Sequence, residues 1–200
     1  MPFSDLHARV VEIRARIAHA VARGGHGQEV SIVAVTKTFG PEAVHAAFDV
    51  GIADIGENKV QEALGKQAAV TLPLRWHLIG HLQRNKVKAL DHFHLLHALD
   101  GARLADAIAA WAHARGAPVR VLLQVNVVGE ETKGGYALSE VEREGDRLRG
   151  LGGLSVIGAM TMAPYGAPET VLRGCFAGAR RARDLLAAAG HPAAELSMPT

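Results

Sequence analysis

Short apolar runs alternate with amphipathic segments along the whole chain, and this alternation restricts the fold more than any other feature. Each run has the length of a buried strand, and the segments between them carry apolar residues at helical spacing. The runs lie at 30–36, 52–55, 76–79, 95–99, 119–127, 154–161 and 194–198. Because parallel neighbours need crossover connections, strands separated by helices predict a parallel α/β sheet.

Two architectures satisfy this alternation, a doubly wound sheet and a (β/α)8 barrel of the TIM type, and periodicity does not choose between them. Seven strands are one fewer than barrel closure needs, and the seventh run coincides with the end of the sequence. We therefore expect a (β/α)8 TIM-type barrel lacking the eighth strand and last helix. No linker interrupts the pattern, so residues 1–200 are expected to form a single domain.

Capping residues predict several helix boundaries. Ser4 suits the N-cap of the first helix, and Gly24-Gly25 suits its end. Pro41 suits the first turn of the next helix. A capping-box pattern, Ser139-Glu140-Val141-Glu142, predicts the start of a later one. A further helical pattern covers 83–90.

Composition excludes several classes of function. Lys and Arg number 22 against 20 Asp and Glu, no basic stripe appears, and aromatic residues are few, so we expect no nucleic-acid binding. Neither a signal segment nor an apolar stretch of membrane-spanning length is present, so we expect no membrane partner. The single cysteine, Cys175, suits the reducing cytoplasm. For the oligomeric state, we expect a monomer or a weak dimer.

Lys37 is the strongest candidate for chemistry. It follows the apolar run 30–36 and precedes a turn that opens a helix, which is where α/β sheets and barrels place their functional groups. Partial burial there would favour the neutral amine, the form that condenses with an aldehyde. Taken alone, the position also suits a lysine that reaches solvent or pairs with a carboxylate.

Other polar groups follow later strands. Asn58 lies between a strand and a helix, where it caps the helix or directs its amide at a bound ring. Arg84 and Lys86 follow the run 76–79 and suit either an anion site or a solvated helix start. His92, His94 and His97 form the tightest histidine group, but their spacing lacks the further ligands of a zinc site, and no metal is expected.

Together these passages resemble the pyridoxal phosphate homeostasis proteins, a family related to the barrel domain of alanine racemase. The passages are Ala34–Thr38, Ile55–Glu62, Trp76–Lys86, Leu123–Asn126 with Lys133-Gly134-Gly135, and Gly158–Pro164. They occur in the family's order and at about its spacing, over nearly the whole chain.

The resemblance implies a barrel that holds pyridoxal 5′-phosphate at the carboxyl ends of its strands. Lys37 matches the Schiff-base lysine, and Asn58 matches an asparagine near the cofactor. Met160 falls in a strand lining the same pocket, and Lys133 matches a loop lysine that could take part in cofactor loading. Ser197 matches the start of the family's phosphate-binding turn, but Pro199 stands where the family has glycine. Proline lacks the backbone N–H that such a turn would use, so a weakened phosphate site and a shortened family member are expected.

By this resemblance the chain is a non-catalytic carrier or regulator of pyridoxal phosphate, with cofactor-dependent apo-enzymes as candidate partners. A racemase-like enzyme is the alternative, and it would need a second acid or base, for which only Tyr136 and Tyr165 supply tyrosines. A remnant with impaired cofactor binding is a third reading.

Overall fold

Seven parallel strands form one sheet in the computed structural model, which describes residues 3–130 and 134–199. The strands are hydrogen-bonded in sequence order, each to the next, as expected for a barrel wall and unlike a doubly wound sheet. They are β1 (Val33–Val35), β2 (Asp54–Glu57), β3 (Arg75–Leu78), β4 (Leu95–Leu99), β5 (Val119–Gln124), β6 (Leu154–Met160) and β7 (Glu195–Ser197).

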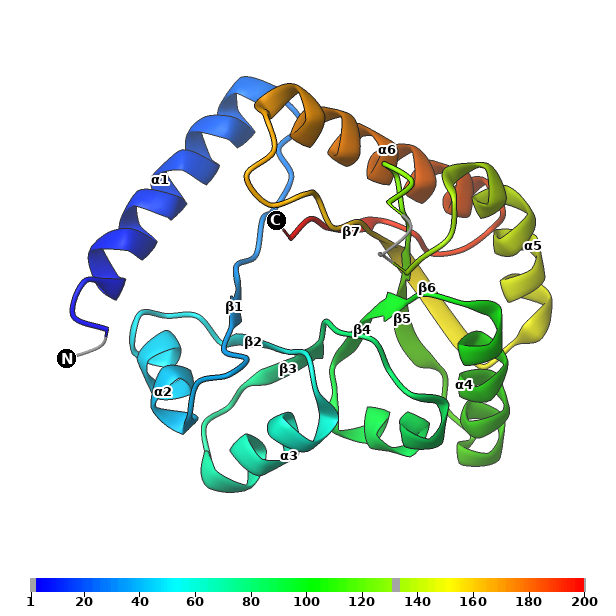
Figure 1. Cartoon of the computed structure of the whole chain (residues 1–200), viewed down its shortest axis with the longest axis horizontal. Coiled ribbons are helices and arrows are strands. Elements are labelled where there is room, and N and C mark those ends of the chain that lie inside the picture. The colour runs from blue at the N-terminus through cyan, green and yellow to red at the C-terminus, as the bar shows by residue number, and fades with distance from the viewer. Residues whose placement is uncertain (1–2, 131–133, 200) are drawn as a thin grey trace.

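Helices connect the strands and lie outside them, so that the molecule is a ring of strands surrounded by helices (Figure 1). They are α1 (Leu6–Gly24), α2 (Pro41–Asp49), α3 (Val60–Ala69), α4 (Ala102–Arg115), α5 (Val141–Leu151) and α6 (Glu169–Ala188), with 3-10 helices η1 (Arg84–His92) and η2 (Leu138–Glu140). The predicted (β/α) barrel type is confirmed. Within the described residues the wall is open, because β1 and β7 end the strand order and no eighth strand joins them.

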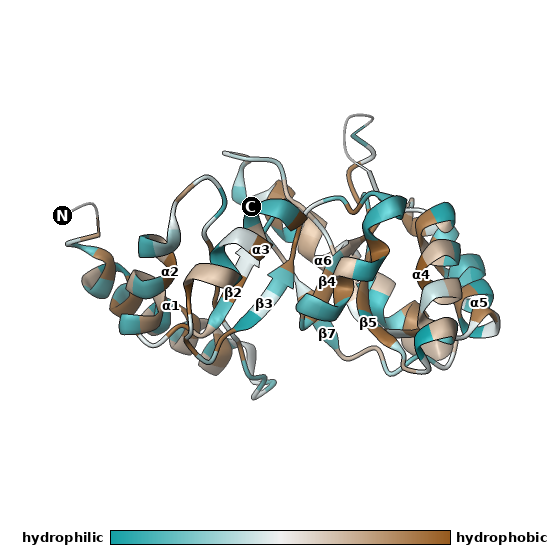
Figure 2. Cartoon of the chain, turned by 90° about the horizontal axis from the view of Figure 1, so that it is seen from below, coloured by the Kyte–Doolittle hydropathy of each residue, from teal (hydrophilic) through white to brown (hydrophobic). Residues whose placement is uncertain are grey.

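Apolar side chains fill the layer between the strands and the helices. Fully buried residues of this layer include Leu96, Leu123, Val156 and Ile108. A second group, Leu95, Ala98, Leu122, Ile157 and Met160, is also buried. Figure 2 shows β5 as mostly hydrophobic and α5 as mostly hydrophilic, while β3 carries hydrophilic residues. β2 and β4 are buried on both faces, whereas β1 and β7 at the two ends of the sheet are only partly buried.

Local differences from the sequence predictions have simple causes. The N-cap position of α1 is Asp5, not Ser4, whose hydroxyl hydrogen-bonds Asp5 instead. The segment predicted as a helix over 83–90 is the 3-10 helix η1. The box predicted from Ser139 to Glu142 lies two residues earlier in the structure, where the Glu140 carboxylate accepts a hydrogen bond from the backbone N–H of Ala137. Gly25, with φ 67°, ends α1 as predicted.

Candidate functional site

The residues singled out in the sequence follow strands that run in one direction, so their backbones lie at the same end of the barrel. Lys37 comes two residues after β1 and Asn58 directly after β2, while Met160 and Ser197 are the last residues of β6 and β7. This is the end of the sheet at which barrel proteins carry their sites. Lys133 lies outside the described residues.

Alternation along β1 determines the direction of Lys37. Ile32 and Ala34 pack against the apolar cluster under the helices, and Thr36 also points to that side, where it meets Glu57. The alternate position, Val35, therefore faces the inside of the ring, and Lys37 follows it in the turn closed by the hydrogen bond from the Phe39 N–H to the Thr36 carbonyl oxygen. Lys37 is exposed, so the partial burial expected for its amine is not provided by the described residues.

A buried ion-pair cluster lies directly beside the Lys37 turn. Lys66 of α3 contacts Glu57 Oε1 at 2.6 Å and Glu62 Oε1 at 2.9 Å, and its Nζ also donates to the backbone carbonyl of Thr36 at 2.7 Å. The Thr36 hydroxyl donates to the same Glu57 oxygen at 2.5 Å. The backbone of the lysine turn is thereby attached to α3.

Asn58 is half-buried and does not cap α3. The N-cap residue of that helix is Lys59, which makes no side-chain capping hydrogen bond. The Asn58 backbone packs closely against Gly80, where an added Cβ would lie 2.6 Å from the Asn58 carbonyl oxygen. The helix-capping interpretation is therefore wrong, and contact with a ligand remains a prediction for the Asn58 amide.

Met160 is 1% exposed and belongs to the buried apolar group of Leu95, Ala98, Leu122 and Ile157. It packs as a core residue, and its contact with a cofactor stays a prediction.

A chain of hydrogen bonds connects four strands through buried side chains. His77 Nε2 lies 2.9 Å from Asp54 Oδ1, His77 Nδ1 lies 2.9 Å from His97 Nε2, and His97 Nδ1 lies 2.9 Å from Ser197 Oγ. Arg75 forms an ion pair with the other Asp54 oxygen. The residues come from β2, β3, β4 and β7, so the chain joins the last strand to the first half of the sheet.

The direction of these hydrogen bonds follows from protonation. Burial lowers the pKa of His97 to about 3, and burial also lowers the pKa of His77, against the opposing effect of Asp54. Both rings are therefore neutral near pH 7, and His77 donates from Nε2 to the Asp54 carboxylate. His97 then donates to His77, and the Ser197 hydroxyl donates to His97. In this arrangement the Ser197 proton points into the barrel, so donation to a phosphate would require the chain to rearrange.

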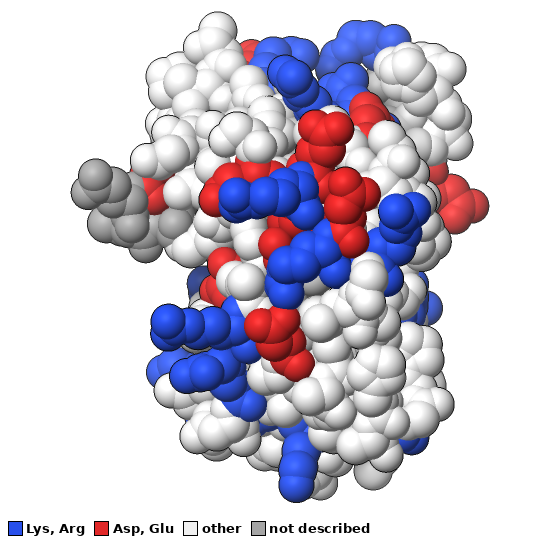
Figure 3. All heavy atoms as spheres, turned by 90° about the vertical axis from the view of Figure 1, so that its right-hand side faces the viewer, with Lys and Arg blue, Asp and Glu red and all other residues white. Residues whose placement is uncertain are grey.

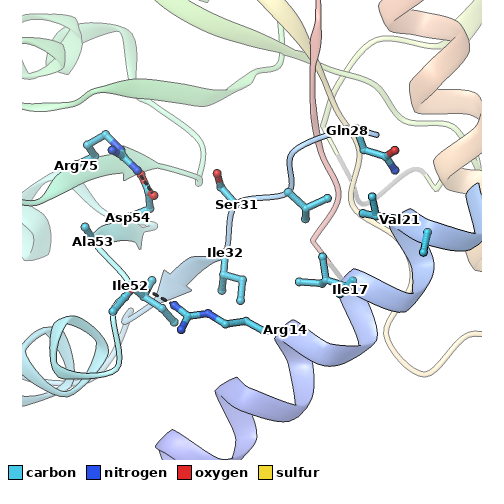
Figure 4. Close-up of a pocket in the computed structure, with 14 residues that line it drawn as sticks. Arg14, Ile17, Val21, Gln28, Ser31, Ile32, Ile52, Ala53, Asp54 and Arg75 are labelled. Carbon is cyan, nitrogen blue, oxygen red and sulfur yellow. Dashed lines mark hydrogen bonds and ion pairs between the residues drawn. The ribbon is translucent and has the colours of Figure 1, made fainter. Parts of the chain in front are cut away.

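Two cavities lie at opposite ends of the strands. One, of about 610 Å³, is lined by α1 and by residues that precede or begin β1, β2 and β3, including Arg14, Ser31, Asp54 and Arg75 (Figure 4). It therefore lies at the amino ends, where barrels rarely carry sites. The other, of about 710 Å³, is lined by residues 81–85 and 100–104 after β3 and β4. Only the second shares the end of the barrel with Lys37.

Charge on the described surface is mixed. On the side that carries α5, Lys and Arg interleave with Asp and Glu (Figure 3), and Arg147 bridges Asp106 and Glu144 at 2.6 Å and 2.7 Å. Such pairing gives no continuous basic stripe for a nucleic-acid backbone. No helix among the described residues is long and apolar enough to cross a membrane. The same residues contain no group of three or more His, Cys, Asp or Glu arranged to hold a metal ion.

Sequence reasoning missed the buried polar residues around the site. Lys66 was detectable, because it follows Val60 and Ala63 at three-residue steps on the buried face of α3. Glu57 lies two residues after buried Ile55, and a period of two places both on the same face of β2. The pairing of His97 with Ser197, 100 residues apart, had no local signal.

Comparison with known proteins agrees with this geometry. Residues 10–199 match the family model described as "Alanine racemase, N-terminal domain". The pyridoxal phosphate homeostasis protein of Pseudomonas aeruginosa is 36% identical over 186 residues, which cover 92% of this chain and 80% of the relative. Its counterpart in Aquifex aeolicus is 38% identical over 181 residues, or 89% of this chain and 79% of the relative.

Solved structures give the same picture. PipY of Synechococcus elongatus PCC7942 with PLP bound has a TM-score of 0.78 at 30% identity, covering 96% of this chain and 87% of PipY. An alanine racemase of Clostridium difficile has a TM-score of 0.72 at 14% identity, covering 86% of this chain and 46% of the racemase, and this likeness shows the fold alone. The strand order, the lysine after β1 and these similarities place the chain in the pyridoxal phosphate homeostasis protein family.

Proposed function

We propose that this chain binds pyridoxal 5′-phosphate at the carboxyl ends of its strands, covalently through Lys37, and acts in the homeostasis of that cofactor without catalysing a reaction of its own. The observation that carries the proposal is the position of Lys37, an exposed residue in the turn that follows β1 at the carboxyl end of the sheet. The family and the PLP-bound PipY structure support it.

The residues at this end of the barrel fit the cofactor's chemistry. Pyridoxal phosphate would supply an aldehyde when bound, and the Lys37 amine would be the group that holds it covalently. Lys37 is accessible to solvent. Its turn is attached to α3 through Lys66, so the backbone from which the amine extends is held in place. We assign the ring contact to Asn58 and contacts beside the cofactor to Met160 and Ser197.

A non-catalytic role is supported by the two tyrosines. The Tyr136 hydroxyl is committed to Glu144, to which it donates at 2.8 Å, and burial raises its pKa. Tyr165 is 96% exposed and follows β6 in a loop. Racemisation needs an acid or base opposite the lysine, and a buried tyrosine bonded to a carboxylate is poorly suited to that role.

The experiment is reduction of the purified protein with borohydride after mixing with pyridoxal phosphate. We expect an absorbance band that borohydride removes, and a pyridoxyl modification that mass spectrometry of peptides places on Lys37. Lys37→Ala should show neither. Lys59→Ala, which removes an exposed lysine at the start of α3, is the matched control and should behave like the wild type. Absence of the band from the wild type would overturn the proposal.

Two further parts of the proposal concern the cell. We propose that the protein works in the cytoplasm, to which its single buried cysteine is suited, and that it exchanges the cofactor with pyridoxal-dependent apo-enzymes. Mixing the loaded protein with such an apo-enzyme and following the recovery of that enzyme's activity tests the exchange. Assays with alanine and serine enantiomers test the racemase alternative, and turnover that depends on Lys37 would favour it.

A further inference from the structure

The two neighbours of Lys37 in the sequence are held by one cluster of charged side chains, of which Glu57 and Lys66 are buried and Glu62 is partly exposed. On the amino side, Lys66 Nζ donates to the Thr36 carbonyl oxygen at 2.7 Å. On the carboxyl side, Glu62 Oε1 accepts a hydrogen bond from the Thr38 backbone N–H at 2.5 Å. Since Lys66 and Glu62 also contact each other at 2.9 Å, both attachments belong to the same cluster.

Burial restrains two members of this cluster. Glu57 is fully buried, and the Lys66 side chain is only 5% exposed. Lys66 directs its ammonium at two carboxylates and one carbonyl, so its three N–H groups all have acceptors. A buried charge that loses a partner is costly, and such a cluster therefore resists displacement of any one member.

The turn that the cluster holds is one that the chain would not adopt by itself. Thr38 has φ 69°, and among the described residues no other non-glycine residue has a positive φ. For a β-branched residue this conformation is strained and persists only where surrounding contacts impose it. The Glu62 carboxylate supplies such a contact, because it binds the Thr38 N–H directly.

We propose that Glu57, Glu62 and Lys66 are positioning residues for Lys37, which fix its backbone on both sides and so set where the amine meets the aldehyde of the cofactor. This inference rests on the proposed function. The Lys37 side chain is exposed and gains little direction from packing. The backbone conformation of the turn must therefore set the position of the Lys37 Cα, and with it the region that the amine can reach. None of the three residues is assigned a contact with the cofactor, and they act through the turn.

Substitution of Glu62 separates positioning from simple stability. Glu62→Ala removes the acceptor for the Thr38 N–H and should weaken the affinity for pyridoxal phosphate by about tenfold, the loss expected if the freed turn holds the binding conformation about a tenth of the time. Glu62→Gln retains an acceptor oxygen and should lose less. Glu42→Ala is the matched control, because Glu42 accepts from the Gly40 N–H in the same loop but does not touch a neighbour of Lys37.

A second substitution tests the strained turn itself. Glycine adopts a positive φ without steric cost, so adding Thr38→Gly to Glu62→Ala should recover part of the lost affinity. If the cluster served stability alone, Glu62→Ala would lower the midpoint of thermal unfolding and leave the affinity for pyridoxal phosphate unchanged. Titrations by absorbance and thermal unfolding of the same samples distinguish these outcomes.

Amide hydrogen exchange reports on the turn without any cofactor. We expect slow exchange of the Thr38 N–H in the wild type and exchange at least tenfold faster in Glu62→Ala. If the wild type formed no Schiff base with pyridoxal phosphate, the proposed function would be overturned. Two other results would overturn the positioning role alone. One is a Glu62→Ala protein that binds the cofactor with wild-type affinity, and the other is fast exchange of the Thr38 amide in the wild type.

Discussion

The buried histidine chain makes the stability of this protein sensitive to mild acid, and His97 provides the test. His97 is 5% exposed, and burial lowers its pKa from 6.5 to about 3. His77 and His94 stand next to it and act in the same direction, because a positive charge on either ring disfavours one on His97. The folded protein therefore keeps His97 neutral at pH values where the unfolded chain protonates it.

The sign of the effect follows from proton linkage. Because the folded pKa lies below the unfolded value, the contribution of His97 to stability is complete above pH 6.5 and is lost as the pH falls toward 3. Between about pH 7.5 and about pH 5 this single group should remove about 2 kcal/mol from the free energy of unfolding. The carboxylates Asp54 and Glu62 have lowered pKa values, so they titrate below this window.

The perturbation is His97→Gln, which removes the titrating group and keeps a side chain able to donate and accept. Urea unfolding followed by circular dichroism at several pH values gives the free energy of unfolding of each protein. We expect the loss between about pH 7.5 and about pH 5 to be smaller in His97→Gln than in the wild type by about 2 kcal/mol. His45→Gln is the control, because it makes the same replacement at an exposed position of α2. Equal pH dependence in His97→Gln and the wild type would refute the argument.

Two further predictions concern the stability of the fold. An alanine Cβ at Gly158 in β6 would overlap the carbonyl oxygen of Glu195 in β7, so Gly158→Ala should separate these strands and cost more than about 3 kcal/mol in urea unfolding; a wild-type midpoint would contradict this. Tyr136→Phe leaves the buried Glu144 carboxylate without the hydroxyl that donates to it at 2.8 Å, and should cost about 1–2 kcal/mol in the same assay. No loss of stability in Tyr136→Phe would show that Arg147 alone satisfies the carboxylate.

Much of the fold was predictable from local pattern. The seven apolar runs correspond to β1–β7, and the central strands among them are buried on both faces, which leaves short, continuous hydrophobic stretches in the sequence. Helix ends were predictable where the backbone requires a special residue, as at Gly25 after α1 and Pro41 at the start of α2. Ser4 and Ser139 misled because several residues near a helix start can serve as caps.

The candidate site was only partly predictable. Lys37 is conspicuous because it follows the apolar run 30–36 at a strand-to-helix turn, where α/β proteins place their functional groups. Lys66 and Glu62 looked like ordinary charged residues of an amphipathic helix, since a 3.6-residue period does not reveal which carboxylate or carbonyl a buried lysine will meet. The predicted burial of Lys37 was wrong because burial depends on distant segments.

The sequence alone determined the order and type of the elements, the parallel sheet and the position of Lys37 directly after the first strand, because these depend on residues close together in the chain. The tertiary structure alone decided which polar groups meet. It joined the Lys37 turn to α3 through Glu62 and Lys66, and it joined His97 to Ser197 across 100 residues. The physical reason is that propensity and periodicity act over a few residues, whereas pairing between buried polar groups depends on how all the strands come together.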